Sequence, residues 1–420
     1  MVQRREFLKV SAGVLGAALA APSPPVAGQE TPDPIRALRP MVGGITKITD
    51  TERMARMEKA RRLMVENGLD AIVMEPGSTL TYYTDVRWWA SERLFALILP
   101  ARGALAWICP KFEEDRAREL IRFGDDIRCW EEDENPYRFV RGVLRDRGLR
   151  TGRIGIEERV RFFIADGIRK ELPGWEILSA DPVTVGCRVI KSPAEIALMQ
   201  RANDISIVAY RAAAATVKEG MSPSEFSAHC SAAFRALGVS GGVSVSIGKA
   251  SAFPHGSSQP QKLSDGDVVL MDGGCSVEGY QSDISRSLVF GKPTQRQREI
   301  WNLVRRAQDA AFAAAKVGVP CEDVDAAARS VIVNAGFGPG YKLPGLPYRT
   351  GHGIGMDGHE WTNLVKGNKT PLQPGMCFSN EPMVAIPGEF GIRHEDCMHI
   401  TEAGGEFFTR PSLSIDEPFG

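Results

Sequence analysis

The chain has 420 residues, of which 43% are apolar and 25% are charged, a composition that suits two globular domains with ordinary hydrophobic cores. The formal net charge is −1, and no Lys/Arg-rich run stands out beyond the N-terminus, so nucleic acid is not an expected partner. The eight cysteines are widely spaced and form no C-x-x-C pair, which argues against a zinc knuckle or a thioredoxin-type site. Most of them are expected in the core, although an exported protein could also form one or two disulfides.

The N-terminus has the pattern of an export signal. Arg4-Arg5 stands in a twin-arginine motif, and a weakly apolar run over 10–20 follows it. This run is shorter than the ~20 residues that cross a bilayer, and it ends in small residues that suit a signal peptidase. We expect residues 1–30 to hold a twin-arginine signal peptide and the start of a Pro-rich linker, which continues over 31–48. The mature protein is then expected in the periplasm or another extracytoplasmic location, with the twin-arginine export machinery as a partner and no stable membrane anchor.

Residues 49–188 alternate between helical and strand patterns, which predicts a small α/β domain. Helices are expected over 51–66, 112–123, 137–147 and 162–171, and strands over 71–74, 94–99, 104–109 and 154–157. The pairs Tyr82-Tyr83 and Trp88-Trp89 are interpreted as core, with covering of a neighbouring subunit's site as the alternative. No cluster of candidate catalytic residues lies in this domain.

Residues 189–415 form the second predicted domain, which contains an internal repeat. A capping box at Ser192-Pro193-Ala194-Glu195 begins a long helix that is expected to run to Gly220. A shorter helix over 225–237 and a hairpin follow, and the same order recurs with a long helix that ends near 316, a shorter one over 322–334 and a second hairpin. Each half therefore contributes one hairpin.

Each of the two hairpins carries a pair of carboxylates. Asp272 ends an apolar strand, and the chain returns through Gly279 so that Asp283 is expected to lie across from it. Glu381 and Glu395 flank a turn at 386–388, and His352 lies in a glycine-rich segment that permits close approach. Four carboxylates in an apolar interior repel one another, and divalent cations would relieve that repulsion. The five residues therefore predict a site for two metal ions.

Several segments resemble one known family. They are Met271-Asp272-Gly273-Gly274, Ser282-Asp283-Ile284-Ser285-Arg286, His352-Gly353-Ile354-Gly355-Met356-Asp357-Gly358-His359-Glu360, Asn380-Glu381-Pro382 and Gly391-Ile392-Arg393-His394-Glu395-Asp396. With them the chain is similar to the creatinase/aminopeptidase P/prolidase metallopeptidases. The resemblance implies an α/β (α+β) fold class, with a creatinase-like N-terminal domain and a pita-bread catalytic domain of pseudo-two-fold symmetry. It also implies a homodimer.

The resemblance extends to individual site residues. It implies that Asp272, Asp283, His352, Glu381 and Glu395 are the dimetal ligands and that Glu381 also carries a proton during catalysis. It further implies that His255 and His359 are catalytic residues that bind the substrate. Arg393 lies two residues before Glu395, so strand alternation puts both on one face, where Arg393 holds either a ligand carboxylate or a substrate carboxylate.

The expected chemistry is hydrolysis. Two cations lower the pKa of a bridging water towards ~7, so that hydroxide attacks the amide carbon while one cation polarises the carbonyl. Four oxygen donors and one nitrogen favour a hard ion such as Mn²⁺, with Zn²⁺ or Co²⁺ as alternatives. His229 and His399 are interpreted as structural.

Departures from the family pattern concern the substrate more than the chemistry. Ser285 stands where Thr is usual, and Met383 stands where Gly is common. Asn363 stands where proline dipeptidases often have an arginine. Lys366 or Arg393 could take the place of that missing arginine. The leading hypothesis is a hydrolase of Xaa-Pro peptides, either a dipeptidase or an aminopeptidase. The alternatives are a C–N hydrolase or lyase for a small non-peptide amide or related solute, and a non-catalytic binding protein.

Overall fold

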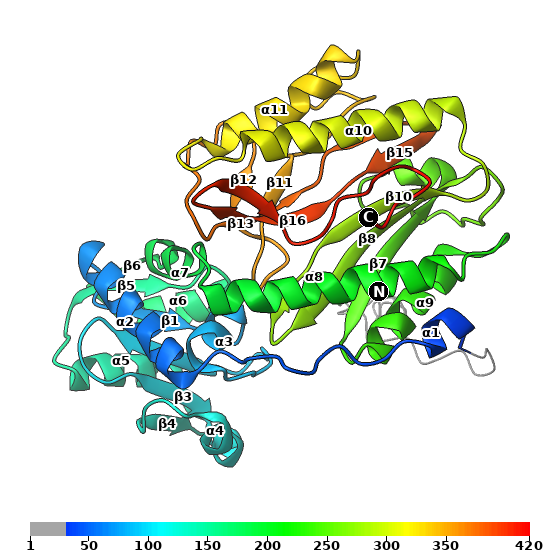
Figure 1. The fold of residues 1–420 in the computed structure, drawn as a ribbon. Helices are drawn as coiled ribbons and strands as arrows, with labels where there is room; N and C mark the ends of the chain where they lie inside the picture. The colour runs from blue at the N-terminus through cyan, green and yellow to red at the C-terminus, as the bar shows by residue number, and fades with distance from the viewer. Residues whose placement is uncertain (1–30) are drawn as a thin grey trace, which may run out of the picture.

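The computed structural model describes residues 31–420, so the predicted signal peptide of residues 1–30 lies outside the described residues. A smaller N-terminal domain lies at one end of the long helix α8 (Pro193–Ala214), which runs along one side of the larger C-terminal domain (Figure 1). None of the helices in residues 31–420 combines the length and apolar character that crossing a membrane requires.

The predicted linker is not a free spacer in the part that the structure describes. A short helix, α1 (Asp33–Arg36), lies against the C-terminal domain and buries Ile35 in the same core as helix α8. The amide of Met41 then donates a hydrogen bond of 2.9 Å to the carbonyl of Leu237. The side chain of Ile35, this backbone bond and a further hydrogen bond from Arg201 to the carbonyl of Met41 hold the segment on the domain surface.

The N-terminal domain is built on a mixed six-stranded sheet of order β4-β3-β2-β1-β5-β6. Its strands are β1 (Ala71–Met74), β2 (Ala96–Pro100), β3 (Ala106–Pro110), β4 (Ile127–Trp130), β5 (Gly152–Ile156) and β6 (Trp175–Ser179). Its helices are α2 (Asp50–Glu66), α3 (Ser78–Thr84), α4 (Glu114–Leu120) with the 3-10 turn η1 (Lys111–Glu113) before it, α5 (Tyr137–Asp146), α6 (Phe162–Glu171) and α7 (Asp181–Arg188). Because successive side chains point to opposite faces, Ile72 and Met74 enter one core while Ala71 and Val73 enter the other.

Strong periodic segments of this domain were predicted and weak ones were not. The predicted helices over 51–66 and 162–171 and the hairpin of β2 and β3 are present. Strands β4 and β6 and helices α3 and α7 were not predicted. Tyr82 and Tyr83 on α3 are buried as expected, whereas Trp89 is 72% exposed and does not belong to the core.

The C-terminal domain repeats one arrangement twice. Helix α8 and helix α9 (Pro223–Ala236) cover a sheet of order β10-β8-β7, and helices α10 (Gln295–Ala314) and α11 (Cys321–Asn334) cover a sheet of order β12-β11-β13-β16-β17 (Figure 1). The first sheet contains β7 (Gly241–Ile247), β8 (Val268–Val277) and β10 (Ile284–Val289), with β9 (Tyr280–Gln281) paired to β8 and the 3-10 turn η2 (Gly248–Ala252) after β7. The second contains β11 (Gly351–Gly353), β12 (Glu360–Leu364), β13 (Cys377–Asn380), β16 (Asp396–Thr401) and β17 (Gly404–Phe407). A separate hairpin of β14 (Met383–Ile386) and β15 (Phe390–Arg393) lies between β13 and β16 along the chain.

Helix starts follow the sequence signals closely, but one helix end does not. Capping boxes at Ser192 and Ser222 start α8 and α9, with the serine side chain bonded to the backbone of the third helical residue. The prediction that the first long helix continues to Gly220 was wrong, because α8 ends at Ala214. Just beyond it, the hydroxyl of Thr216 donates to the carbonyl of Ala213 at 2.6 Å, a local bond that competes with continued helix.

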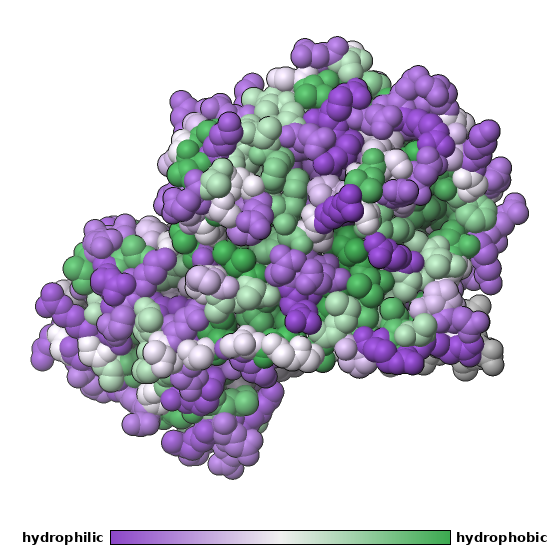
Figure 2. All heavy atoms as spheres, viewed as in Figure 1, coloured by the Kyte–Doolittle hydropathy of each residue, from purple (hydrophilic) through white to green (hydrophobic). Residues whose placement is uncertain are grey.

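Polar and apolar residues are clearly segregated on the visible face. Figure 2 shows hydrophilic residues over the outer helices of both domains and apolar residues gathered in the band between α8 and α10. All eight cysteines are free, and all but the half-buried Cys129 are buried, as expected for small core side chains.

A buried ion pair joins the two halves of the C-terminal domain. Arg286 on β10 donates to Asp396 on β16 at 2.6 Å, and neither side chain is exposed. Asp396 also accepts hydrogen bonds from Gln308 of α10 at 2.9 Å and from Thr409 at 2.6 Å. The sheets of both halves and one covering helix thus meet at a single carboxylate.

We expect Arg286→Met to lower the free energy of unfolding by about 3–5 kcal/mol, because Asp396 is left buried without its cation. Arg298→Met is the matched control, since Arg298 pairs with Asp416 at the exposed surface and such pairs contribute about 0–1 kcal/mol. Denaturant unfolding followed by circular dichroism measures both. Equal losses in the two variants would contradict the importance of the buried pair.

Candidate metal centre and active site

The five predicted metal ligands converge at one cavity of the C-terminal domain. Asp272 lies on β8, Asp283 directly before β10, His352 on β11, Glu381 directly after β13 and Glu395 directly before β16. The cavity has a volume of about 560 Å³ and is lined by all five. Donor atoms lie within 4.8 Å of one another in two triads, His352 with Glu381 and Glu395, and Asp272 with Asp283 and Glu395. Since Glu395 belongs to both triads, the arrangement suits two adjacent cations that share one carboxylate.

The two glutamates lie where one strand ladder ends and the next begins. The pairing of β13 with β16 ends at Asn380 and Asp396, and the pairing of β14 with β15 begins at Met383 and Arg393. Glu381 and Glu395 fall in the gap, and the amide of Glu381 donates to the carbonyl of Thr350 at 2.8 Å instead. The break in the ladder therefore brings both carboxylates to one side of the sheet.

The two aspartates are not directly opposite each other, contrary to the sequence expectation. Asp272 pairs with Ser285 across β8 and β10, and Asp283 lies two residues before that partner. The chain leaves the ladder at Asp283. The amide of Asp283 donates a hydrogen bond of 3.3 Å to the sulfur of Cys397, and the thiol of Cys397 donates one of 3.1 Å to the carbonyl of Asp283. This offset lets both carboxylates reach the cavity without facing each other across the strands.

Ser285 links the carboxylates of both halves. Its hydroxyl lies 3.0 Å from Asp272 Oδ1 and 2.6 Å from Glu395 Oε2, and it accepts a hydrogen bond of 2.9 Å from Arg393 Nε. Arg393 Nη2 lies 2.5 Å from Asp272 Oδ2, which places this buried guanidinium on a ligand carboxylate. Either a ligand carboxylate or a substrate carboxylate was expected as the partner of Arg393. In the structure its partner is the ligand carboxylate of Asp272.

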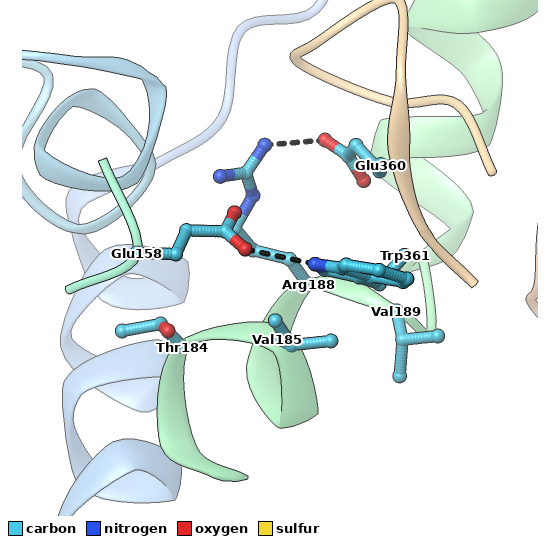
Figure 3. Close-up of a pocket in the computed structure, with 7 residues that line it drawn as sticks. All are labelled: Glu158, Thr184, Val185, Arg188, Val189, Glu360 and Trp361. Atoms are coloured by element: carbon cyan, nitrogen blue, oxygen red, sulfur yellow. Dashed lines mark hydrogen bonds and ion pairs between the residues drawn. The ribbon is translucent and has the colours of Figure 1, made fainter. Parts of the chain in front are cut away.

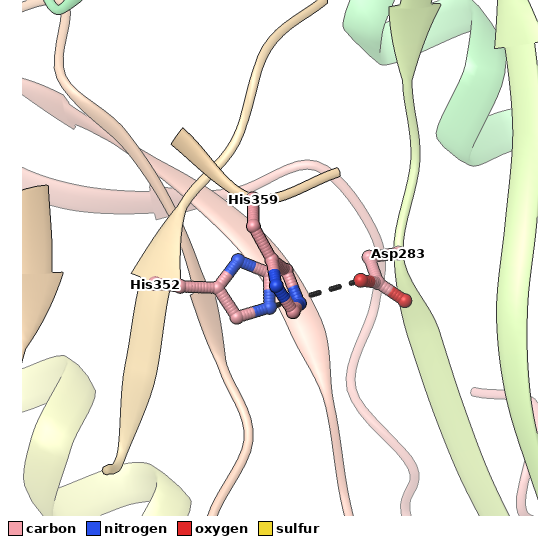
Figure 4. Close-up of side chains that lie close together, drawn as sticks. All are labelled: Asp283, His352 and His359. Carbon is pink, nitrogen blue, oxygen red and sulfur yellow. Dashed lines mark ion pairs between the residues drawn. The ribbon is translucent and has the colours of Figure 1, made fainter. Parts of the chain in front are cut away.

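His352 presents a free nitrogen lone pair to the carboxylates. Its Nδ1 lies 3.1 Å from the carbonyl of Gly353, so the proton is assigned to Nδ1 and Nε2 faces the cavity. Nε2 lies 3.4 Å from Glu381 Oε1 and 3.8 Å from Asp283 Oδ2, and Figure 4 shows the ring directed toward that aspartate. Burial, with a contribution from His359, lowers the pKa of His352 to about 3. The ring is therefore neutral at physiological pH, as a metal ligand must be.

The raised pKa values of the buried carboxyl groups indicate that the protein's own cations do not balance their charge. Burial, followed by the neighbouring Asp272, raises the pKa of Asp283 well above its usual range, and burial with Asp283 does the same for Glu395. Burial raises the pKa of Glu381 to about 7. Glu395 Oε1 is buried and has no hydrogen-bond partner among residues 31–420. Four oxygen ligands, one neutral nitrogen and an unpartnered buried oxygen fit divalent cations.

Other side chains line the open part of the same cavity. His255 and His359 are exposed at its rim, and the rings of His352 and His359 lie 4.0 Å apart between centroids. Burial, followed by Arg349, lowers the pKa of His359, so this ring is also neutral near pH 7. Tyr348 and Arg349 line the cavity as well and were not predicted from the sequence. Their position just before His352 was the one available signal, and it was a weak one.

Comparison with known proteins identifies the family. Residues 197–402 match the model of metallopeptidase family M24, and residues 56–190 match the creatinase/prolidase N-terminal domain. The chain is 35% identical to an uncharacterized peptidase from Schizosaccharomyces pombe over 86% of this chain and 82% of that one. It belongs to metallopeptidase family M24.

Individual relatives agree with this membership. A Xaa-Pro dipeptidase from Lactobacillus helveticus is 29% identical over 86% of this chain and 98% of its own length. The crystal structure of a dipeptidase from Pyrococcus horikoshii is 31% identical with a TM-score of 0.78, covering 84% of this chain and 98% of that one. The predicted fold class, a creatinase-like domain followed by a pita-bread domain, is thereby confirmed.

In this M24 chain, the N-terminal domain holds the loop that carries His359. Arg188 of α7 donates to Asp357 at 2.6 Å and also pairs with Glu360, as Figure 3 shows for Glu360. Lys191 adds a second cation 2.9 Å from Glu360. Glu158 accepts a hydrogen bond of 3.0 Å from the indole of Trp361 (Figure 3). The residues on both sides of His359 are thus fixed by ion pairs across the domain interface.

Below pH 7, we expect the affinity of the site for Mn²⁺ to increase by roughly tenfold or more for each unit by which the pH is raised. The reason is that a cation must displace the protons of Glu381, Asp283 and Glu395. The raised pKa values set this sign, since protonated carboxyls bind no metal. His352 releases no proton in that range. Titration of Mn²⁺ into chelator-treated protein at several pH values measures the dependence.

Glu381→Gln is the control for this titration, because it removes one titrating group and should make the pH dependence less steep. A Mn²⁺ affinity that stays constant between pH 5 and pH 7 would contradict the release of protons from these carboxyls when metal binds.

Proposed function

We propose that this metallopeptidase hydrolyses the amide bond of Xaa-Pro peptides, with Asp272, Asp283, His352, Glu381 and Glu395 as ligands of two divalent cations. The observation that carries the proposal is the convergence of four carboxylates and a neutral imidazole on one cavity, with Glu395 shared by two triads. The Xaa-Pro dipeptidase from Lactobacillus helveticus, which matches over nearly its whole length, supports this class of substrate.

The donor set favours Mn²⁺, with Zn²⁺ or Co²⁺ as alternatives, because hard oxygen ligands predominate. Two cations bound there would supply an activated water at neutral pH and polarise the substrate carbonyl. Arg393 contacts the carboxylate of Asp272, and Ser285 contacts those of Asp272 and Glu395, so these two side chains orient two of the ligand carboxylates. Such supporting contacts change metal affinity or activity by about 10- to 100-fold when they are removed.

The remaining site residues act on the substrate. The exposed rings of His255 and His359 stand at the rim of the cavity, where an imidazole N–H donates to the scissile carbonyl and stabilises the developing oxyanion. Glu381, which reaches the cavity from the end of β13, is suited to take the proton of the attacking water and deliver it to the leaving nitrogen.

The proposal is tested by loading the protein with Mn²⁺ and measuring release of the N-terminal residue from Xaa-Pro dipeptides, Xaa-Pro-Yaa peptides and matched Xaa-Ala dipeptides. We expect cleavage of at least one Xaa-Pro series, two metal ions per chain by elemental analysis, and loss of activity after chelation. His359→Gln should lower kcat by about 100-fold or more with unchanged metal content, because one oxyanion donor is lost.

His399→Gln is the control for that variant, since His399 lies on β16 outside the cavity and should leave kcat unchanged. Failure to cleave any Xaa-Pro peptide at full metal occupancy would sink the proposal. Turnover of a small cyclic amide or amidine instead would favour the non-peptide alternative.

We also propose that the protein is exported through the twin-arginine pathway and works as a homodimer in the periplasm. The support is the Arg4-Arg5 motif and the exposed aromatic residues Trp89 and Phe162 on the N-terminal domain. Expression of the full chain should give a periplasmic protein that lacks about 20–30 residues and has twice the subunit mass by light scattering. Arg4→Lys with Arg5→Lys should retain it in the cytoplasm. A double-lysine variant that is still found in the periplasm would contradict export by this pathway. A monomeric mass would contradict the homodimer.

A further inference from the structure

Two cysteines of the N-terminal domain stand side by side on neighbouring strands. Cys109 on β3 is paired in register with Cys129 on β4, and the two strands run parallel. Neighbouring strands of a sheet lie about 4.8 Å apart. The Cα atoms of disulfide-bonded cysteines are usually about 4.4–6.8 Å apart, so this pairing suits a disulfide without a large movement of the backbone. No other two cysteines in residues 31–420 occupy paired positions of adjacent strands.

The two side chains also point to the same face of the sheet. Trp107 and Cys109 enter one core, whereas Ile108 between them enters the core on the other face. Ile127 and Cys129 of β4 pack against the first of these cores. Since side chains alternate along both strands, residues in register share a face. The thiols of Cys109 and Cys129 therefore lie next to each other on one side of the sheet.

Burial gives the two thiols different access to solvent. Cys109 is fully buried, and burial raises the pKa of its thiol to about 12. Cys129 is only half-buried, so a reagent from solvent reaches it first. Its strand β4 is at the edge of the sheet and has a neighbouring strand on one side only. This strand can therefore adjust toward β3 without disturbing the rest of the sheet.

We propose that Cys109 and Cys129 form a disulfide when the folded protein meets a disulfide oxidant. The Cys129 thiol, once deprotonated, attacks one sulfur of the oxidant, which forms a mixed disulfide and releases the first oxidant thiol. The Cys109 thiol then attacks the sulfur of Cys129, which closes the bond between the strands and releases the second oxidant thiol. The two cysteines give up two protons and two electrons, and the oxidant takes up both.

Oxidation of this pair in the cell rests on the proposed export. Disulfides persist in the periplasm and are rare in the cytosol. A chain exported in the folded state can be oxidised only where a thiol is still within reach, and the half-buried Cys129 meets that condition. The bond would close the loop over 110–128 and tie the edge strand β4 to β3. It would thereby stabilise the N-terminal domain by restricting the unfolded chain.

The test uses the purified protein, fully reduced and then incubated in its native state with oxidised glutathione. Peptide mapping without reductant should show one cross-linked species that joins the peptides of Cys109 and Cys129 and lacks two hydrogen atoms. The oxidised protein should unfold at a temperature roughly 5 °C or more above that of the reduced protein, because the closed loop restricts the unfolded chain. Adding a reductant should abolish the difference.

Two variants sharpen the outcome. Cys129→Ala should lose both the cross-link and the thermal shift, and it should leave the fold intact because this side chain is half-buried on an edge strand. Cys230→Ala is the matched control, since Cys230 lies buried on α9 and the variant should retain both.

Three results would overturn the proposal. They are a stable mixed disulfide of glutathione with Cys129 alone, two thiols that remain reduced, and cross-links that join other cysteines instead. A cross-link in the purified protein together with a cytoplasmic location in the cell would support the pair and contradict only the proposed export.

Discussion

The concentration of four carboxylates in one cavity of the C-terminal domain is the constraint on which the rest of this structure depends. Asp283, Glu381 and Glu395 hold protons more tightly than free carboxyls do, because burial and their mutual repulsion oppose ionisation. The protein supplies one guanidinium to offset this charge, that of Arg393, which pairs with Asp272. The remaining charge requires cations, so metal binding and the integrity of this region are physically coupled.

Both halves of the C-terminal domain are needed to create that constraint. The backbone amides of Ser285 and Glu395 exchange hydrogen bonds of 3.3 Å and 3.2 Å with each other's carbonyls, joining the two sheets at one bridge. Neighbouring residues on the same strands point the other way, and there Arg286 pairs with Asp396. Strand alternation thus puts the metal ligands on one side of the junction and a buried ion pair on the other. The bridge that forms the site is also the bridge that holds the halves together.

The N-terminal domain contributes to the substrate side of the site and none of the predicted metal ligands. Arg188 fixes Asp357 and Glu360 around His359, and the indole of Trp361 is bonded to Glu158. The metal centre is therefore a property of one domain, whereas the loop that carries His359 is held by contacts from the other.

The sequence by itself determined the features that depend on local chemistry. The capping box at Ser192 marked the start of α8, and the order of helices and hairpins revealed two equivalent halves. The identities and spacing of the five donors were sufficient to predict a dimetal site. Each of these signals is contained in a short stretch of chain, so it is legible without knowledge of the fold.

Only the tertiary structure decided the register of Asp272 against Ser285 and the end of α8. It also decided the different contacts of the arginines. Arg393 and Arg349 are indistinguishable as residue types, yet one is bonded to a serine 108 positions away and the other faces a cavity. The partners that distinguish them lie on distant strands. Their proximity arises from the docking of two sheets and a neighbouring domain, which no local pattern encodes.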